Sequence, residues 1–186
     1  MNVGATSETD YGDYFMWGST TPNTASQCTW SNAPFNNGLD SYNKEYFNAH
    51  KSEWLDDNNN LKPEYDAARA IMGGDWRMPT KEEFDELLSG TTNKWITNYN
   101  GTVVKGMKFT SKTDESKYIF IPAAGYCHDG SVYDVDDQGY VWSSSLGPSD
   151  PGGDWVFAWY LYFYSTSCSM YNMYRYSGRS VRGVCK

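Results

Sequence analysis

The stretch WRMPTKEEF, residues 76–84, decides how this chain is divided into structural elements. Thr80 followed three residues later by Glu83 is a capping box, in which each side chain binds a free backbone amide at the start of a helix. Phe84, Leu87 and Leu88 then recur at helical spacing, before Gly90. The stretch therefore predicts an amphipathic helix over residues 81–89.

The segments before this helix predict a second helix and a long irregular region. In KPEYDAARAIM, residues 62–72, a proline and an acid occupy the first turn, and two glycines follow the last residue. These signals predict a helix over residues 63–72. Residues 1–60 are rich in Asn, Ser, Thr, Gly and Asp, so we expect irregular structure there, held by aromatic side chains such as Trp17.

The pattern changes to a period of two from about residue 102, which is typical of β-strands. Two helices followed by many short strands predict an α+β fold with small antiparallel sheets, in one domain over residues 1–186. The expected strands lie at residues 103–104, 107–109, 118–121, 140–142, 155–164, 171–176 and 180–184.

Composition and charge exclude several classes of function. The chain has 186 residues, a net charge of −8, 16 Tyr, 8 Trp and 8 Phe. A negative chain repels phosphate backbones, so we expect no nucleic-acid partner. No apolar run approaches the roughly 20 residues that span a bilayer, and no signal peptide is visible, so we expect no membrane insertion by this segment.

The four cysteines, Cys28, Cys127, Cys168 and Cys185, lie far apart in the sequence. They could form two disulfides in any of the three pairings that four cysteines allow, or they could be free thiols.

Four sequence segments, in order, resemble one protein family. Residues 76–84 are followed by IPAAGY at 121–126, YVWSSS at 140–145 and GRSVRGV at 178–184. Together they resemble the formylglycine-generating-enzyme-like, or sulfatase-modifying-factor, branch of the C-type lectin fold, over residues 63–185. The resemblance implies a C-type lectin-like fold that is loop-rich. The opening residues 2–18 look like secreted gut-bacterial members, which implies an extracytoplasmic protein on a cell or phage surface.

Residues 158–165 and 175–178 resemble the variable region of diversity-generating retroelement proteins. Those systems replace adenines in Asn codons, which can produce Tyr, Ser or Asp but not Lys, Glu, Gln, Trp or Met. Residues 142–185 contain no Lys, Glu or Gln, although the chain has 10, 8 and 2 of them. The resemblance implies that residues 142–185 are a variable, ligand-contact region in which Trp155, Trp159, Met170 and Met173 belong to the scaffold.

Alternation along residues 159–164 separates two faces of a strand. Trp159, Leu161 and Phe163 fall on one face, expected in the core, and the tyrosines between them fall on the other. Tyrosine combines a large contact area with a hydroxyl, which suits a binding surface, although tyrosines could also brace a two-layer sheet. We expect an exposed face that binds a protein or glycan on another surface. Its expected residues are Tyr160, Tyr162, Tyr164, Ser167, Ser169, Tyr171, Asn172, Tyr174, Tyr176 and Ser177, with Ser167, Ser169 and Tyr171 in a connecting turn, and with Asp150 and Asp154 as further candidates.

Enzymatic signals are weak. His50 and His128 are the only histidines and lack the spacing of a metal site. Formylglycine-generating enzymes use two redox-active cysteines, and the surroundings of Cys168 and Cys185 do not match that motif.

We therefore expect a binding module with no catalysis, metal or cofactor. Arg175 and Arg182 are expected to be structural hydrogen-bond donors. A surface subunit with a fixed glycan or fimbrial partner, and a formylglycine-generating-type enzyme, are the alternatives.

Overall fold

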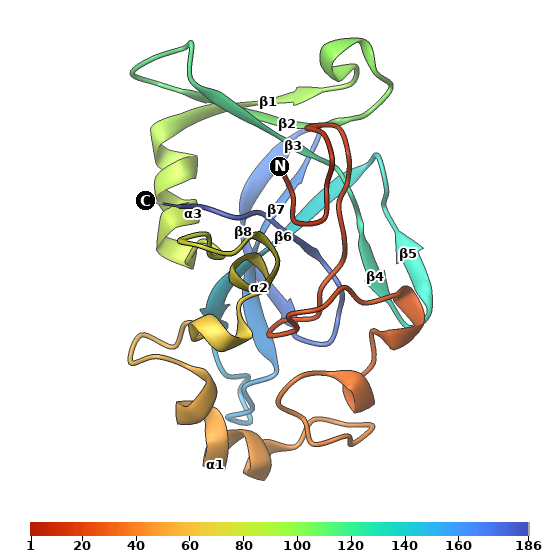
Figure 1. Cartoon of the computed structure of the whole chain (residues 1–186), viewed down its shortest axis with the longest axis vertical. Helices are drawn as coiled ribbons and strands as arrows, with labels where there is room; N and C mark the ends of the chain where they lie inside the picture. Colours follow the sequence, from red (N-terminus) through yellow and green to blue (C-terminus); the bar gives the residue numbers. More distant parts are fainter. Residues whose placement is uncertain (186) are drawn as a thin grey trace.

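The computed structural model describes residues 1–185 and has an α+β architecture with mostly antiparallel sheets (Figure 1). Its three α-helices are α1 (Lys44–Trp54), α2 (Ala67–Met72) and α3 (Lys81–Gly90). Short 3-10 helices lie at Ala25–Gln27, Trp30–Asn32, Pro63–Tyr65 and Tyr99–Gly101. The α+β prediction is confirmed, with one helix more than expected.

Three sheets make up the rest of the fold. The first has the order β1-β2-β3, the second is the hairpin β4-β5, and the third has the order β8-β7-β6-β9. All neighbouring strands are antiparallel except β6 and β9, which run parallel. The strands are β1 (Thr91–Ile96), β2 (Gly106–Ser111), β3 (Tyr118–Pro122), β4 (Tyr126–His128), β5 (Ser131–Tyr133), β6 (Gln138–Leu146), β7 (Phe157–Tyr164), β8 (Ser167–Tyr174) and β9 (Ser180–Val181).

Helix α3 forms as the capping box predicts. The Thr80 hydroxyl accepts a hydrogen bond from the Glu83 amide at 3.3 Å, and the Glu83 carboxylate accepts one from the Thr80 amide at 2.9 Å. Both carboxylate oxygens of Glu83 also accept from Arg77, each at 2.6 Å. The buried Phe84 faces Leu161 and Phe163, so the helix covers one side of the four-stranded sheet.

The expectation that residues 1–60 are wholly irregular is wrong. Helix α1 begins after Asn43, whose side chain accepts a hydrogen bond from the Tyr46 amide at 3.1 Å. Phe47 and Trp54, seven residues and two turns apart, are the buried side chains of this helix. Only these two positions anchor α1 in the core, which explains why its periodicity was too weak to predict it.

The helix predicted over residues 63–72 is divided at Asp66. Its carboxylate accepts hydrogen bonds from the amides of Arg69, at 3.0 Å, and Met78, at 2.8 Å. The first bond caps α2, and the second ties α2 to the chain that leads into α3. A capping side chain with extended backbone cannot lie inside a helix, so Pro63–Tyr65 forms a separate 3-10 turn.

The strand predictions are correct for the centres of β2, β3, β6 and β7 and in part for β8 and β9, but wrong elsewhere. Residues 103–104 form no strand, and Val103 is 86% exposed. Strand β8 begins at Ser167, so Ser167, Ser169 and Tyr171 belong to a strand and not to the expected turn, which is Ser165-Thr166. Strand β9 ends at Val181, and strands β1, β4 and β5 were not predicted because each is polar or only three residues long.

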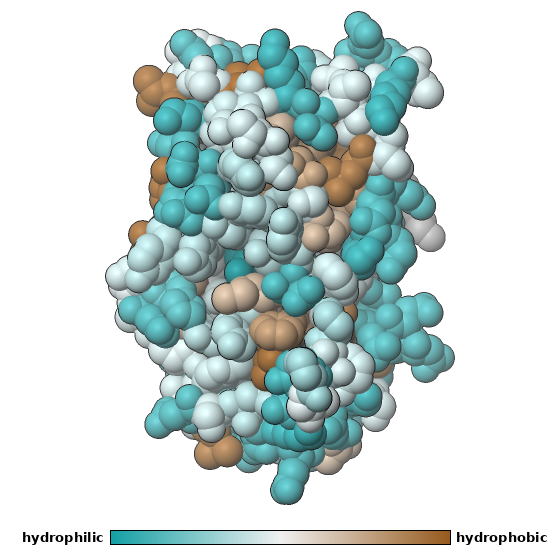
Figure 2. Space-filling view, turned by 180° about the vertical axis from the view of Figure 1, so that it is seen from behind, coloured by the Kyte–Doolittle hydropathy of each residue, from teal (hydrophilic) through white to brown (hydrophobic). Residues whose placement is uncertain are grey.

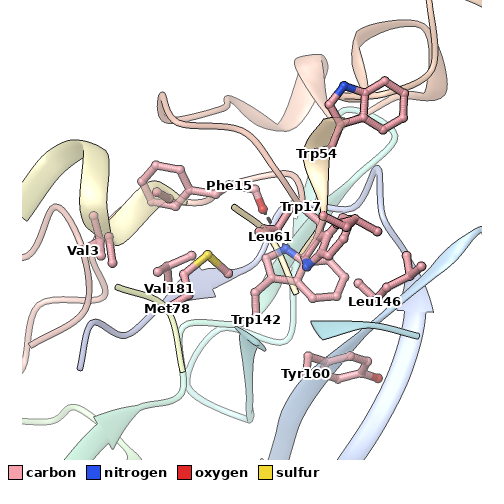
Figure 3. Close-up of a cluster of buried hydrophobic side chains, with 14 of the residues drawn as sticks. Val3, Phe15, Trp17, Trp54, Leu61, Met78, Trp142, Leu146, Tyr160 and Val181 are labelled. Carbon is pink, nitrogen blue, oxygen red and sulfur yellow. Dashed lines mark hydrogen bonds between the residues drawn. The ribbon is translucent and has the colours of Figure 1, made fainter. Parts of the chain in front are cut away.

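The central core joins the two ends of the chain (Figure 3). The Trp17 indole donates to the Ser143 carbonyl at 3.0 Å, and the Trp142 indole donates to the Phe15 carbonyl at 2.8 Å. The amide of Val3 donates to the carbonyl of Val181 at 2.8 Å. The first residues of the chain are therefore packed against its last strand.

Arg175 and Arg182 are structural donors, as expected. The Arg175 Nε donates to the Trp155 carbonyl at 3.0 Å, and Arg182 donates to the Phe120 carbonyl at 3.3 Å. The guanidinium of Arg175 also lies 4.3 Å from the centre of the Phe47 ring. Its burial is thus compensated by a carbonyl and an aromatic face.

No helix in the described part of the chain combines the length and the apolar character needed to cross a bilayer.

Candidate functional site

Cross-strand pairing gathers tyrosines from three strands on one side of the four-stranded sheet. Tyr162 of β7 pairs with Tyr140 of β6, and Tyr160 of β7 pairs with Tyr171 of β8. Paired residues project to the same side of a sheet, so these tyrosines share a face with Tyr164. We call the side that carries these five tyrosines the tyrosine face.

The rings of the tyrosine face contact one another. The centroid of the Tyr162 ring lies 5.1 Å from that of Tyr140, 5.4 Å from that of Tyr171 and 5.5 Å from that of Tyr164. Spacings in this range are favourable for tilted and edge-to-face aromatic pairs. Tyr162 is therefore the centre of a preformed aromatic surface.

The β4-β5 hairpin extends this surface. The Tyr126 ring lies 4.8 Å from the Tyr140 ring and stacks at 5.4 Å on the Tyr133 ring. Tyr133 is exposed, whereas Tyr126 is half-buried. The aromatic surface reaches beyond residues 142–185, and the sequence did not reveal this because the contact between β4 and β6 is tertiary.

Exposure across the tyrosine face is uneven, which corrects the expectation for Tyr160. Tyr160 is only 7% exposed because it packs against Trp142 in the core, and Figure 3 shows its ring at the edge of that cluster. Tyr162 and Tyr164 are half-buried, and Tyr171 is 50% exposed. The open part of the face is thus formed by Tyr162, Tyr164 and Tyr171, with the half-buried Ser167 and Ser169 between them.

Asn172 and Tyr174 do not join the tyrosine face, contrary to expectation. Asn172 pairs with Trp159, and Tyr174 pairs with Phe157, so both project to the opposite side of the sheet. The prediction failed because it assumed a turn where β8 already runs, and a shift of one residue reverses the face of every side chain. Met173, assigned to the scaffold, instead pairs with Ala158 and projects from the tyrosine side, where it is 39% exposed.

Tyr176 and Ser177 lie beyond the end of β8, beside His128. The Tyr176 ring packs 4.8 Å from Trp30 and 5.0 Å from His128. Ser177 is buried, not exposed as expected, and its hydroxyl lies 3.4 Å from the His128 Nδ1. Tyr176, together with Trp30 and His128, therefore forms an aromatic flank next to the tyrosine face.

Asp150 and Asp154 are held in a turn near α1. The Asp154 amide donates to the Asp150 carboxylate at 2.8 Å, and the Asp154 carboxylate pairs with Lys44 at 2.9 Å. Both side chains have partners within the fold, and the structure does not bring them to the tyrosine face.

The hydroxyls of Tyr140 and Tyr162 remain protonated near neutral pH. Burial, assisted by a hydrogen bond to Asp134 at 2.8 Å, raises the pKa of Tyr140 well above its ordinary value. Burial also raises the pKa of Tyr162, whose hydroxyl donates to the Gln138 side chain. A neutral phenol both donates and accepts hydrogen bonds, so the half-buried Tyr162 can contact a partner of either polarity, whereas Tyr140 is buried.

A small cavity opens beside the buried end of the tyrosine face. Its volume is about 220 Å³. Arg179 lies against it with only 2% of its surface exposed, between the rings of Trp142 and Tyr160. The sequence did not indicate a site at Arg179. This residue lies in the GRSVRGV stretch, which resembles a family motif, and its neighbours in the cavity come from four separate segments. The cavity is lined by Tyr126, His128, Tyr140, Tyr160, Met173, Ser177 and Arg179.

Comparisons with known proteins identify no relative. No family model, no curated protein and no solved structure matches the chain. The geometry of the site and the resemblance of the motifs therefore carry the functional proposal.

The side chains that the enzymatic alternatives would use lie in four separate places. Within residues 1–185, no three His, Cys, Asp or Glu side chains are grouped as a metal site. Cys168 is half-buried in the cluster under α3, and Cys185 is exposed. His128 lies 3.1 Å from Asp129 and also contacts Ser177, but that serine is buried. His50 binds the Tyr46 carbonyl of its own helix.

Proposed function

We propose that the chain is a C-type lectin-like binding module whose tyrosine face contacts a protein or glycan on another surface. The observation that carries the proposal is the two-sided β7-β8 hairpin. Tyr162, Tyr164 and Tyr171 are open on one side, while Leu161 and Phe163 anchor the other side in the core. A rigid strand pair that presents amphipathic rings binds at a low entropic cost.

The fold proposal rests on the family motifs and on the closure of the chain ends. Asn2 forms a β-bridge with Arg182, and Phe15 forms one with Arg179. Such closure, together with helices preceding a set of short antiparallel strands, supports the C-type lectin-like fold that the motifs imply. An extracytoplasmic place, on a cell or phage surface, goes with this proposal.

We further propose that the surface is diversified by a retroelement and that the chain is not an enzyme. The open positions 162, 164, 167, 169 and 171 of the β7-β8 hairpin carry Tyr and Ser, which adenine substitution in Asn codons can produce, and the exposed Met173 is the exception. On the opposite side, Leu161 and Phe163 are buried, whereas Trp159, which was expected in the core, is only half-buried. Seen from behind, the molecule has mainly hydrophilic and intermediate residues, with apolar atoms in small groups (Figure 2). That side of the molecule therefore has no single large apolar patch.

Two experiments test the proposal. The gene neighbourhood should contain a near-copy of codons 142–185, altered at adenines, beside a reverse transcriptase gene. Its absence would favour a surface subunit of fixed specificity. Copper-dependent oxidation of a peptide thiol by the chain would instead favour the formylglycine-generating-type enzyme.

The second experiment compares two displayed libraries selected for binding to lysozyme and serum albumin. One library randomises residues 162, 164, 167, 169 and 171. The matched control randomises the exposed residues Thr92, Asn93, Lys94, Ser116 and Tyr118 of the β1-β2-β3 sheet region. We expect binders mainly from the first library. Equal yields would mean that the tyrosine face has no special capacity to bind.

A further inference from the structure

Arg179 is a buried cation without an acidic partner. Among the residues that the structure describes, no carboxylate lies within ion-pair distance of its guanidinium. Its Nε and Nη1 atoms are buried and have no hydrogen-bond partner there. Burying a charge is costly unless it is paired, so such a residue needs compensation from elsewhere.

Aromatic rings supply part of that compensation. The guanidinium carbon lies 4.3 Å from the ring centres of both Trp142 and Tyr160, and 5.6 Å from those of Tyr126 and Tyr140. Burial lowers the pKa of Arg179, and interactions with Tyr160 and Tyr140 oppose that lowering. Arginine retains its proton in proteins, so the group remains a cation held between ring faces.

The cavity beside Arg179 therefore combines apolar walls with one positive charge. Ring faces and the Met173 thioether form most of its lining, and the exposed Met173 lies at its rim. Two acids that contact residues of the lining are already engaged, since Asp134 accepts from Tyr140 and Asp129 pairs with His128. The only unpaired charge lining this cavity is the guanidinium.

We propose that this cavity binds a carboxylate on a short apolar stem, namely an acidic side chain of a protein partner, with Arg179 as its counter-ion. The inference rests on the proposed binding role of the tyrosine face and adds a ligand class to it. A cavity of about 220 Å³ holds only a small group. The methylenes of the stem pack on the rings of Tyr126 and Tyr160, and the carboxylate lies near the guanidinium.

The charges favour a monoanion over a phosphate. One guanidinium balances one negative charge, and a dianion would leave excess charge in a site of low dielectric. The chain itself carries a net charge of −8, which adds to the repulsion of a dianion. A carboxylate is also a planar acceptor that matches the fork of an arginine.

The test uses two probes that differ only in charge: N-acetyl-glutamate N-methylamide and N-acetyl-glutamine N-methylamide. Both are titrated into the full chain and followed by amide chemical shifts. We expect the glutamine probe to bind at least about tenfold more weakly, because hydrogen bonds between charged groups are the stronger ones. Shifts should centre on Arg179 and Ser177. Equal binding of the two probes, or no binding of either, would overturn the inference.

Matched variants keep the test independent of folding. Met173→Glu places a negative charge at the cavity rim, and Val103→Glu places the same charge at an exposed position outside the cavity lining. We expect the first variant to weaken binding of the glutamate probe at least about tenfold. The second should leave that binding unchanged, since screening limits the effect of distant charges. An equal effect of both variants would contradict a local site.

A third probe identifies the source of the carboxylate. Glucuronate that binds more tightly than the glutamate probe would overturn the assignment to an acidic side chain and identify a sugar acid as the ligand. The library experiment keeps Met173 and Arg179 constant. If the library yields binders but the glutamate probe does not bind, only the cavity proposal is rejected. If the probe binds but the library yields no binders, only the proposal for the tyrosine face is rejected.

Discussion

At the scale of single residues, Tyr160 and Tyr171 form a natural comparison, because they are directly paired across β7 and β8. One ring is buried against Trp142 and Arg179, and the other is half exposed. Their identical chemistry therefore serves two purposes, one in the core and one at the surface. The distinction depends on what covers each position, so alternation in the sequence could not reveal it.

The same substitution at the two positions should separate these purposes. We expect Tyr160→Ser to lower the free energy of unfolding by roughly 3–5 kcal/mol, because it empties a buried aromatic site. Tyr171→Ser should change it by less than about 1 kcal/mol, as is usual for surface positions. Urea unfolding of both variants decides this. Similar losses at the two positions would mean that Tyr171 is also part of the core.

Cys168 provides a pH-dependent prediction. Burial raises the pKa of its thiol to about 12. Only the thiolate reacts with iodoacetamide, and its fraction rises tenfold per pH unit below the pKa. We expect labelling of Cys168 to be very slow at pH 8 and to accelerate about tenfold per unit up to about pH 11. The exposed Cys185 should be labelled first. Rapid labelling of Cys168 at pH 8, followed by mass spectrometry of its peptide, would contradict its burial.

At the scale of elements, the capping box of α3 is predicted by four consecutive residues and forms in the structure. Thr80 and Glu83 exchange hydrogen bonds, and Arg77 binds Glu83 through two nitrogens. We expect Thr80→Ala to destabilise the chain by about 0.5–2 kcal/mol, the usual cost of losing a cap. Thr92→Ala, at an exposed position of β1, should change stability by less than about 0.5 kcal/mol. Thermal melts of both variants test the contrast, and equal shifts would show that the cap contributes nothing.

The elements that could be predicted are those with local chemistry. Helix α3 has its N-terminal cap within its own sequence, and along residues 159–164 of β7 tyrosines alternate with Trp, Leu and Phe. Helix α1 and the start of β8 could not be predicted, because polar residues there are placed by distant partners. The shared face of Tyr160, Tyr162 and Tyr164 on β7 was predicted correctly, but their exposure was not, since Tyr160 is buried and the other two are half-buried. The contributions of Tyr126, Tyr133 and Arg179 could not be predicted from the sequence, since contacts between distant segments bring these residues to the site.

At the scale of the whole molecule, Cys28 and Cys127 connect the N-terminal segment to β4. Both are buried free thiols, and their sulfurs lie 2.9 Å apart. Gly178 lies against them, and a Cβ atom there would lie 2.2 Å from the Cys127 sulfur and 2.7 Å from the Cys28 sulfur. Gly178 and Cys127 also exchange backbone hydrogen bonds at 2.8 Å. Three distant segments therefore meet at one sulfur pair.

We expect oxidised glutathione to convert these two thiols to a disulfide. Each thiol loses a proton, the two sulfurs lose two electrons, and one glutathione disulfide is reduced to two glutathione thiols. The bond would close a loop of nearly 100 residues, so unfolding should become harder by about 2–4 kcal/mol, chiefly through a restricted unfolded chain. Urea unfolding of the reduced and oxidised protein measures this, with Cys127→Ser as the control that should not respond. A disulfide mapped to Cys168 or Cys185, or an oxidised protein no more stable than the reduced one, would show that the sulfur pair does not join these segments covalently.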